Sequence, residues 1–79
     1  MPLIKFLGEL QEKYGFKKHT EELDLDKILT RFLTDDEKNH KYLQILINGN
    51  NIGKERNIKV KKDDTITIYI LGGTGYPGG

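Results

Sequence analysis

Alternating apolar and polar positions predict β-strands at both ends of the chain. Residues 3–7 (LIKFL) place Ile4 and Phe6 on one face of a short strand, with leucines on the other face. Residues 65–71 (TITIYIL) alternate most regularly, with an isoleucine at every second position facing inward. Residues 42–48 alternate in the same way in the middle of the chain. These three segments are the main strands of the predicted sheet.

Two other segments carry apolar residues at helical spacing. Residues 9–14 form a short predicted helix, which Gly15 is placed to end. Asp24 begins the longer helix, because its side chain can accept hydrogen bonds from the free N–H groups of the first turn. An apolar stripe at i, i+3, i+4 and i+7 follows it: Leu25, Ile28, Leu29 and Phe32.

The remaining segments are polar or irregular. Residues 17–23 are interpreted as a charged edge strand, and residues 34–41 as a loop. Residues 48–51 (NGNN) tolerate positive φ and predict a tight turn. Residues 52–60 contain a short, irregular strand, and residues 61–64 form a polar turn.

This order of elements predicts an α+β roll. We expect a mixed sheet of about four or five strands with one main helix packed on one face. Residues 1–71 form the folded domain, and residues 72–79 form a glycine-rich tail that projects from the last strand.

The composition excludes several kinds of site. The net charge is +1, whereas nucleic-acid-binding domains are usually much more basic, so no nucleic-acid partner is expected. The chain has no cysteine, which excludes disulfides and thiolate chemistry, and no serine, which excludes a Ser-His-Asp triad.

No metal site, membrane segment or secretion signal is expected either. His19 and His40 lack neighbouring ligands, and Asp35-Asp36-Glu37 lacks the spacing of a calcium loop and is interpreted as part of a turn. The N-terminus lacks the apolar run of a signal peptide, and no stretch is long enough to span a bilayer. We therefore expect a cytoplasmic monomer.

The tail, GGTGYPGG, is the segment with the most distinctive chemistry. Its glycines fit a dinucleotide-binding pattern, but that pattern needs a following helix, for which no residues are left. Two readings stay open: an inert flexible end, and a terminal Gly79 carboxylate that is itself the reactive group. For the second, Gly78 and Gly79 have no side chains and can thread a narrow channel, Pro77 restricts the tail, and Tyr76 offers an anchor for a partner.

Body and tail together resemble the sulfur-carrier and ubiquitin-like branch of the β-grasp superfamily. That branch includes the ubiquitin-related modifier, the archaeal small modifiers, the thiamine sulfur carrier and the small subunit of molybdopterin synthase. The resemblance rests on the order of IKFLGELQEKYG, DLDKILTRFL, ILINGNNI and KKDDTITIYILGG, and on the terminal Gly78-Gly79. It covers nearly the whole chain.

The resemblance implies a β-grasp fold and a carrier that is not itself an enzyme. An E1-like partner would use ATP and Mg²⁺ to adenylate the Gly79 carboxylate, and this chain would bind no cofactor. The product would be a thiocarboxylate for a sulfur acceptor enzyme, as in tRNA thiolation, or an isopeptide to lysines of target proteins, including marking for the proteasome. Since Gly79 ends the sequence, no processing protease is expected.

One departure bears on the choice within the superfamily. The molybdopterin-synthase small subunit usually carries a proline pair where this sequence has Gly72-Gly73, which favours the ubiquitin-related modifier. Sulfur donation in molybdenum cofactor biosynthesis stays open as an alternative, as does a non-covalent binding module with an inert tail.

A docking face for the activating enzyme is also expected. If the main helix covers the isoleucine face of the sheet, the opposite face is left partly open and carries Leu46 and Tyr69. We expect the E1-like enzyme to dock there.

Overall fold

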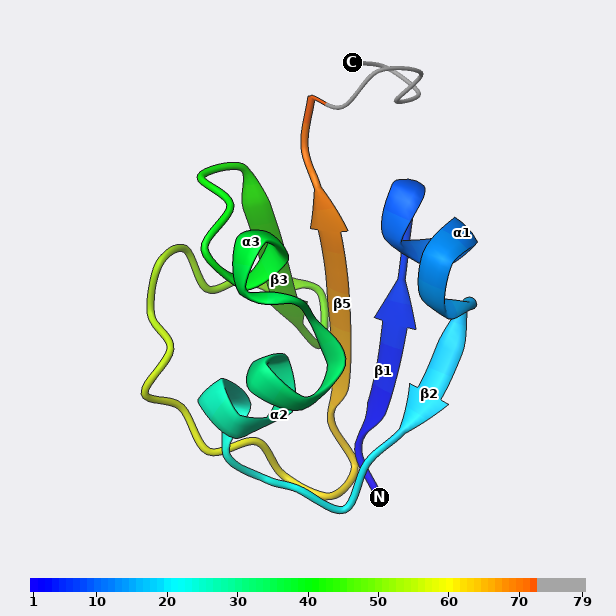
Figure 1. Cartoon of the computed structure of the whole chain (residues 1–79). Helices are drawn as coiled ribbons and strands as arrows, with labels where there is room; N and C mark the ends of the chain where they lie inside the picture. The colour runs from blue at the N-terminus through cyan, green and yellow to red at the C-terminus, as the bar shows by residue number, and fades with distance from the viewer. Residues whose placement is uncertain (73–79) are drawn as a thin grey trace.

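The computed structural model describes residues 1–72, which form one mixed sheet with helices on it (Figure 1). The elements in chain order are β1 (Leu3–Phe6), α1 (Glu9–Tyr14), β2 (Lys17–His19), α2 (Leu25–Phe32), α3 (Asp35–Lys38), β3 (Leu43–Ile47), β4 (Asn50–Asn51) and β5 (Thr65–Ile70). The strand order across the sheet is β2-β1-β5-β3-β4.

The first and last strands lie side by side in the sheet. β5 runs parallel to β1, with Leu3 opposite Thr65, and antiparallel to β3, with Ile45 opposite Ile68. Parallel neighbours need a crossover connection, and the segment that contains α2 supplies it. The predicted mixed sheet with one main helix is confirmed, and it has five strands.

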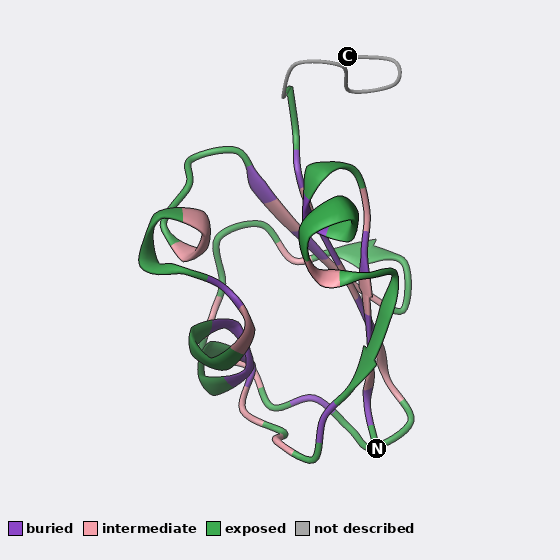
Figure 2. Cartoon of the chain, turned by 45° about the vertical axis from the view of Figure 1, so that its right-hand side comes forward, coloured by how far each residue is buried: buried purple, intermediate pink, exposed green. Residues whose placement is uncertain are grey.

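The core lies between α2 and the isoleucine face of the sheet, where buried residues of both layers meet (Figure 2). The helix contributes Leu25, Ile28 and Leu29, and the three inner strands contribute Ile4, Phe6, Ile45, Ile66 and Ile68. All of these side chains are fully buried. Period-2 alternation in the strands and 3.6-residue spacing in the helix therefore point their apolar sides at each other.

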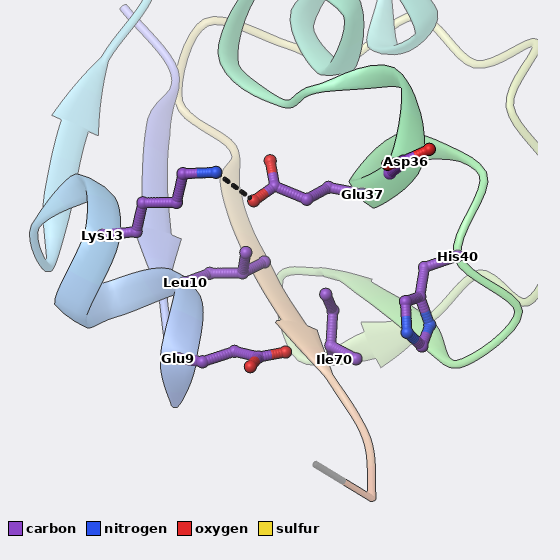
Figure 3. Close-up of a pocket in the computed structure, with 7 residues that line it drawn as sticks. All are labelled: Glu9, Leu10, Lys13, Asp36, Glu37, His40 and Ile70. Carbon is purple, nitrogen blue, oxygen red and sulfur yellow. Dashed lines mark hydrogen bonds and ion pairs between the residues drawn. The ribbon is translucent and has the colours of Figure 1, made fainter. Parts of the chain in front are cut away.

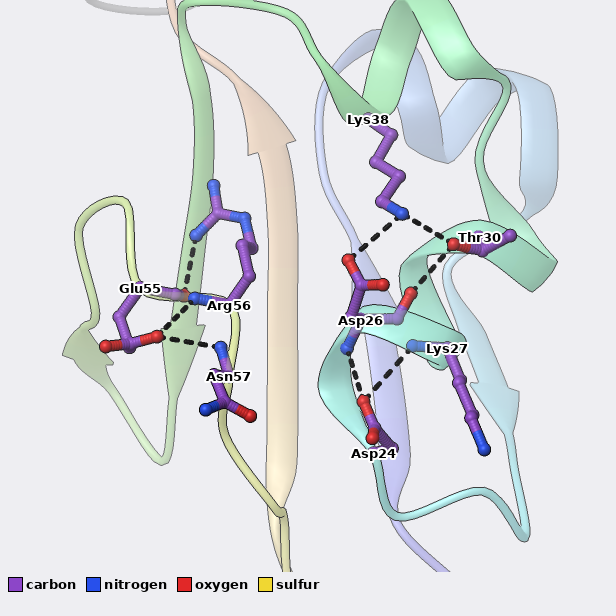
Figure 4. A network of polar contacts seen from close by, with 8 residues as sticks. All are labelled: Asp24, Asp26, Lys27, Thr30, Lys38, Glu55, Arg56 and Asn57. Carbon is purple, nitrogen blue, oxygen red and sulfur yellow. Dashed lines mark hydrogen bonds and ion pairs between the residues drawn. The ribbon is translucent and has the colours of Figure 1, made fainter.

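The start of α2 confirms the predicted cap. The Asp24 side chain accepts hydrogen bonds from the N–H groups of Asp26, at 3.1 Å, and Lys27, at 3.4 Å (Figure 4). At the other end, the N–H of Leu33 donates to the carbonyl of Leu29, and the backbone becomes extended.

The predicted tight turn joins β3 to β4. Asn48 and Gly49 have φ values of 51° and 85°, and Ile47 pairs with Asn50 across the turn. Two successive positive φ values are typical of the type I′ turn that matches the twist of a hairpin.

The prediction of a loop over residues 34–41 is wrong in part, because α3 lies within it. Thr34 and Glu37 form a capping box: the Thr34 hydroxyl accepts from the Glu37 N–H, and the Glu37 carboxylate accepts from the Thr34 N–H. These reciprocal bonds satisfy backbone donors that a short polar helix would otherwise leave open.

Two strand predictions also need correction. The short strand expected within residues 52–60 is instead β4, immediately after the turn. Residues 52–60 contribute a bridge from Lys59 to Asp24 and a hydrogen bond from the Ile52 N–H to the carbonyl of Ile45. Val60 is nevertheless buried. The edge strand expected over residues 17–23 is confirmed only as the three residues of β2.

None of the helices within residues 1–72 has the length and apolar character that crossing a membrane requires.

Candidate functional site

The chain leaves the sheet at the end of its central strand. After Ile70, the N–H of Leu71 donates to the carbonyl of Tyr42 at 3.0 Å, which extends the pairing with the β3 side by one residue. Gly72 follows with φ +81°, a left-handed conformation that side chains disfavour. β5 therefore delivers the chain to residue 72 at one end of the sheet (Figure 1).

The residues predicted to carry the chemistry follow that point. Tyr76, Pro77, Gly78 and Gly79 lie outside the described residues, so their roles stay predictions.

The face of the sheet opposite α2 carries a row of half-buried side chains, which we call the open face: Leu3, Lys5, Leu7, Gln44, Leu46, Thr65, Thr67 and Tyr69. Leu46 lies opposite Thr67, and Tyr69 lies opposite Gln44. Leu46 and Tyr69 are thus diagonal neighbours on adjacent strands, within reach of each other's side chains. The structure places both predicted docking residues on this one face, and their docking role stays a prediction.

A shallow pocket of about 320 Å³ lies on the other side of the strand end, between α1 and α3 (Figure 3). Its lining combines apolar and charged side chains: Glu9, Leu10, Lys13, Asp36, Glu37, His40 and Ile70. Ile70 is the last residue of β5, so the pocket lies next to the point where the chain leaves the sheet.

Glu37 joins the two helices that border this pocket. Its carboxylate forms an ion pair with Lys13 at 2.9 Å and accepts hydrogen bonds from the Tyr14 hydroxyl and the Thr34 N–H. The Glu37 side chain is only 13% exposed, whereas that of Lys13 is 52% exposed. The negative charge of Glu37 is therefore the less exposed of the two charges in this ion pair.

These contacts lower the pKa of Glu37 to about 2. Burial alone would raise the pKa, but hydrogen bonds from Tyr14, the Thr34 backbone and Lys13 favour the ionised form and outweigh it. The same surroundings raise the pKa of Tyr14, first through burial and then through the hydrogen bond to Glu37.

Sequence reasoning missed this cluster, although one signal was present. The segment Thr34-Asp35-Asp36-Glu37 matches the S/T-x-x-E pattern of a capping box, which predicts a helix start. The partners Lys13 and Tyr14 could not be found in this way, because only the tertiary fold brings α1 to α3.

A second, more polar cleft of about 360 Å³ lies between α3 and the loop before β5, lined by Asp26, Lys38, Asn39, His40, Lys54 and Arg56. Lys38 bridges Asp26, at 3.0 Å, and the hydroxyl of Thr30, at 2.6 Å (Figure 4). Across the cleft, Arg56 donates to the backbone carbonyls of Gly53 and Glu55. These contacts hold the helices and the loop in place.

Both histidines are exposed, and His40 Nδ1 accepts a hydrogen bond from the N–H of Tyr42 at 3.1 Å. Within residues 1–72, no three His, Asp or Glu side chains gather closely enough to hold a metal ion.

The mixed sheet, with parallel first and last strands and the main helix on one face, defines the β-grasp fold expected from the sequence. The structure is similar to the crystal structure of Urm1 from Sulfolobus solfataricus, with a TM-score of 0.69 and 22% identity over 89% of this chain and 100% of that one. It is also similar to SAMP1 from Haloferax volcanii, with a TM-score of 0.61 and 16% identity over 91% of this chain and 97% of that one.

No protein-family model matches the sequence, and no curated protein sequence matches it. At the identities of the two solved structures, the likeness establishes the fold of the chain.

Proposed function

We propose that this protein is a ubiquitin-like carrier whose C-terminal Gly79 carboxylate is activated by an E1-like enzyme. The observation that carries the proposal is the exit of the chain from the sheet. The central strand of a β-grasp domain ends at Ile70, and the sequence GGTGYPGG follows after one residue, Leu71. The folded domain would then be the part that partner proteins bind, and the terminal carboxylate would be the group that reacts.

The chemistry requires activation, because a carboxylate is a poor electrophile. In the activating enzyme, with Mg²⁺, an oxygen of the Gly79 carboxylate attacks the α-phosphorus of ATP, and pyrophosphate leaves. A hydrosulfide donor or a lysine amine then attacks the carbonyl carbon of the acyl adenylate, and AMP leaves. This chain serves as a co-substrate in both steps, and Gly78 and Gly79 offer no side chain to obstruct them.

The open face supports docking of that enzyme. Leu46 and Tyr69 lie as diagonal neighbours on central strands, and both are partly exposed. Partly exposed apolar side chains grouped on one face are typical of a partner site. Tyr69 is also on β5, so an enzyme seated there would lie against the strand that leads to the tail.

The tail sequence favours a ubiquitin-related modifier over a subunit of molybdopterin synthase, because Gly72-Gly73 replaces the usual proline pair. The nucleophile that accepts Gly79 decides between the roles of carrier and modifier. Sulfur transfer yields a free thiocarboxylate, whereas modification yields an isopeptide on a target lysine.

The test is intact-mass spectrometry of the full chain recovered from ATP-supplemented extract of its own source. An oxygen-to-sulfur mass change at Gly79 supports the carrier role, and lysine-linked remnants that end in Gly79 support the modifier role. A chain that lacks Gly78-Gly79 is the matched control and should stay unmodified. If the full chain stays as unmodified as this control, the proposal is wrong and the tail is inert.

A further inference from the structure

Among residues 1–72, no strand pairs with the outer edge of β2. β2 is the first strand in the sheet order, and β1 is its only strand partner within residues 1–72 (Figure 1). The carbonyl of Phe16 accepts a hydrogen bond from the Phe6 N–H, and the N–H of Thr20 donates to the carbonyl of Pro2, just before β1. Because backbone groups of successive residues alternate in an antiparallel ladder, the N–H and C=O groups of Lys17 and His19 point away from β1.

Positive charge surrounds this edge. The ammonium groups of Lys5 and Lys17 lie 6.0 Å and 5.6 Å from the centre of the Phe16 ring. Lys18 is also exposed, and it lies on the opposite face of the strand, because successive side chains alternate. The ion pairs of residues 1–72 are Lys13–Glu37 and Lys38–Asp26, so none of these three lysines takes part in one. We call the following set the β2 edge: Lys5, Phe16, Lys17, Lys18 and His19.

An apolar side chain completes this surface. Phe16 is 41% exposed, which leaves much of its ring open to a partner. The nearest acidic residues along the chain are Glu9 and Glu12 in α1, before β2, and Glu21 and Glu22, after it. None of these four forms an ion pair within residues 1–72, and Glu22 accepts hydrogen bonds from the N–H groups of Leu23 and Asp24. The β2 edge therefore combines outward backbone groups, an aromatic ring and lysines that form no ion pair within residues 1–72.

We propose that the β2 edge binds an extended acidic peptide segment of a partner protein as an added strand. The peptide backbone would pair with Lys17 and His19, its carboxylates would lie near the lysines, and an apolar side chain would cover Phe16. Main-chain pairing at an exposed sheet edge is a general mode of peptide recognition. The β2 edge shares Lys5 with the open face but includes neither Leu46 nor Tyr69, and the binding needs no activated Gly79.

Two other occupants fit less well. A second copy of this chain, paired through the same strand, would bring lysines opposite lysines, and like charges directly opposite each other destabilise a strand pair. A nucleic acid would find charge but could not pair with the outward N–H and C=O groups in the manner of a strand. Charge and backbone together favour the acidic peptide.

The experiment is an amide NMR titration of nitrogen-labelled full-length chain with a short capped peptide in which valine and glutamate alternate. We expect shifts centred on Phe16, Lys17 and His19, and slower hydrogen exchange at the Lys17 and His19 amides, because those N–H groups become hydrogen-bonded. A peptide in which valine and lysine alternate is the matched probe and should leave these signals unchanged.

Two variants separate charge from backbone pairing. K17E/K18E should weaken binding about tenfold or more, the combined effect of two reversed surface charges. The control K61E/K62E makes the same change of charge in the turn before β5 and should bind as the wild type does. His19→Pro removes one outward N–H. An edge strand tolerates proline at a position whose N–H side faces solvent, so the fold should persist. The variant should weaken binding although every lysine remains.

Three results would overturn the proposal: shifts centred on Leu46 and Tyr69, no slowing of exchange at Lys17 and His19 when the peptide binds, or equal binding of a single-stranded oligonucleotide. The titration is repeated on the chain that lacks Gly78-Gly79. Unchanged peptide binding there is the expected result and keeps this proposal independent of Gly79 activation, whereas lost binding would contradict the assignment to β2.

Discussion

The hydroxyl of Tyr14 donates a hydrogen bond to the carboxylate of Glu37, a residue 23 positions further along the chain. This bond joins α1 to α3. The first of these helices lies between β1 and β2, and the second follows the main helix α2. The two helices border the pocket beside Ile70 (Figure 3). The partly exposed Glu37 carboxylate therefore helps to fix the shape of the surface beside the end of β5.

Acid should weaken the fold through Glu37. Its folded pKa is about 2, against an ordinary value of 4.5, so its ionised form contributes stability above that value, and the contribution is lost as the pH falls toward 2. Allowing for solvent at this partly exposed site, we expect a loss of about 1–2 kcal/mol in the free energy of unfolding. Urea unfolding between about pH 5 and pH 2 measures it.

The variant Glu37→Gln isolates this effect from the other carboxylates. Its unfolding free energy should depend less on pH over the same range, and it should be lower than that of the wild type at neutral pH. Asp36→Asn, an exposed neighbour in the same helix, is the matched control and should follow the wild-type curve. Parallel curves for Glu37→Gln and the wild type would refute the assignment.

The cap of α2 should contribute measurably to stability. Asp24→Ala removes the acceptor of the Asp26 and Lys27 N–H groups, and we expect a loss of about 1 kcal/mol. Asp24→Asn keeps a side-chain oxygen in place and should lose much less. Equal losses in both variants, measured by urea unfolding, would mean that the charge at the helix start matters more than the hydrogen bonds.

Adenylation should depend on the open face. Leu46→Ser combined with Tyr69→Ser should slow ATP–pyrophosphate exchange by the cognate E1-like enzyme, because it removes apolar contact area from that face. Both residues are only partly buried, so the domain should remain folded by circular dichroism. Leu23→Ser, which changes an exposed leucine before α2, is the control. Unchanged exchange kinetics in the folded double variant would place docking elsewhere.

The β3–β4 turn should require glycine at its second position. Gly49 has φ +85° and open space around its Cα, so an added Cβ would meet no atom but would force an unfavourable backbone conformation. Gly49→Ala should therefore cost about 1 kcal/mol or more of unfolding free energy. Asn50→Ala, at the adjacent exposed position of β4, should cost less than about half of that.

The sequence predicted those elements whose apolar residues repeat with a clear period. Ile66, Ile68 and Ile70 alternate along β5, and Leu25 and Ile28 follow the period of α2, because both sets face the core. Periodicity of this kind records burial, and burial is what the fold requires of these elements.

The elements that the sequence did not predict lack a periodic pattern of apolar residues. α3 consists of Asp35–Lys38 and buries no residue, so only its capping box marks it in the sequence. β4 has two residues, too few to show a period. The contact of Tyr14 with Glu37 depends on how α1 packs in three dimensions, which no local pattern encodes. For the candidate site, alternation was enough to place Leu46 and Tyr69 on one face, whereas the tail assignments rest on residue types alone.

The parallel pairing of β1 with β5 also has a mechanical consequence. A force applied between the start of β1 and the end of β5, as when the chain is pulled by its two ends, would slide these adjacent strands in opposite directions. The evenly spaced bonds of a parallel ladder would then be loaded together rather than broken one after another. Resistance to forced unfolding is governed by the unfolding rate rather than by equilibrium stability. Pulling the chain by its two ends would therefore have to shear β1 from β5, in the middle of the sheet, before these two strands could separate.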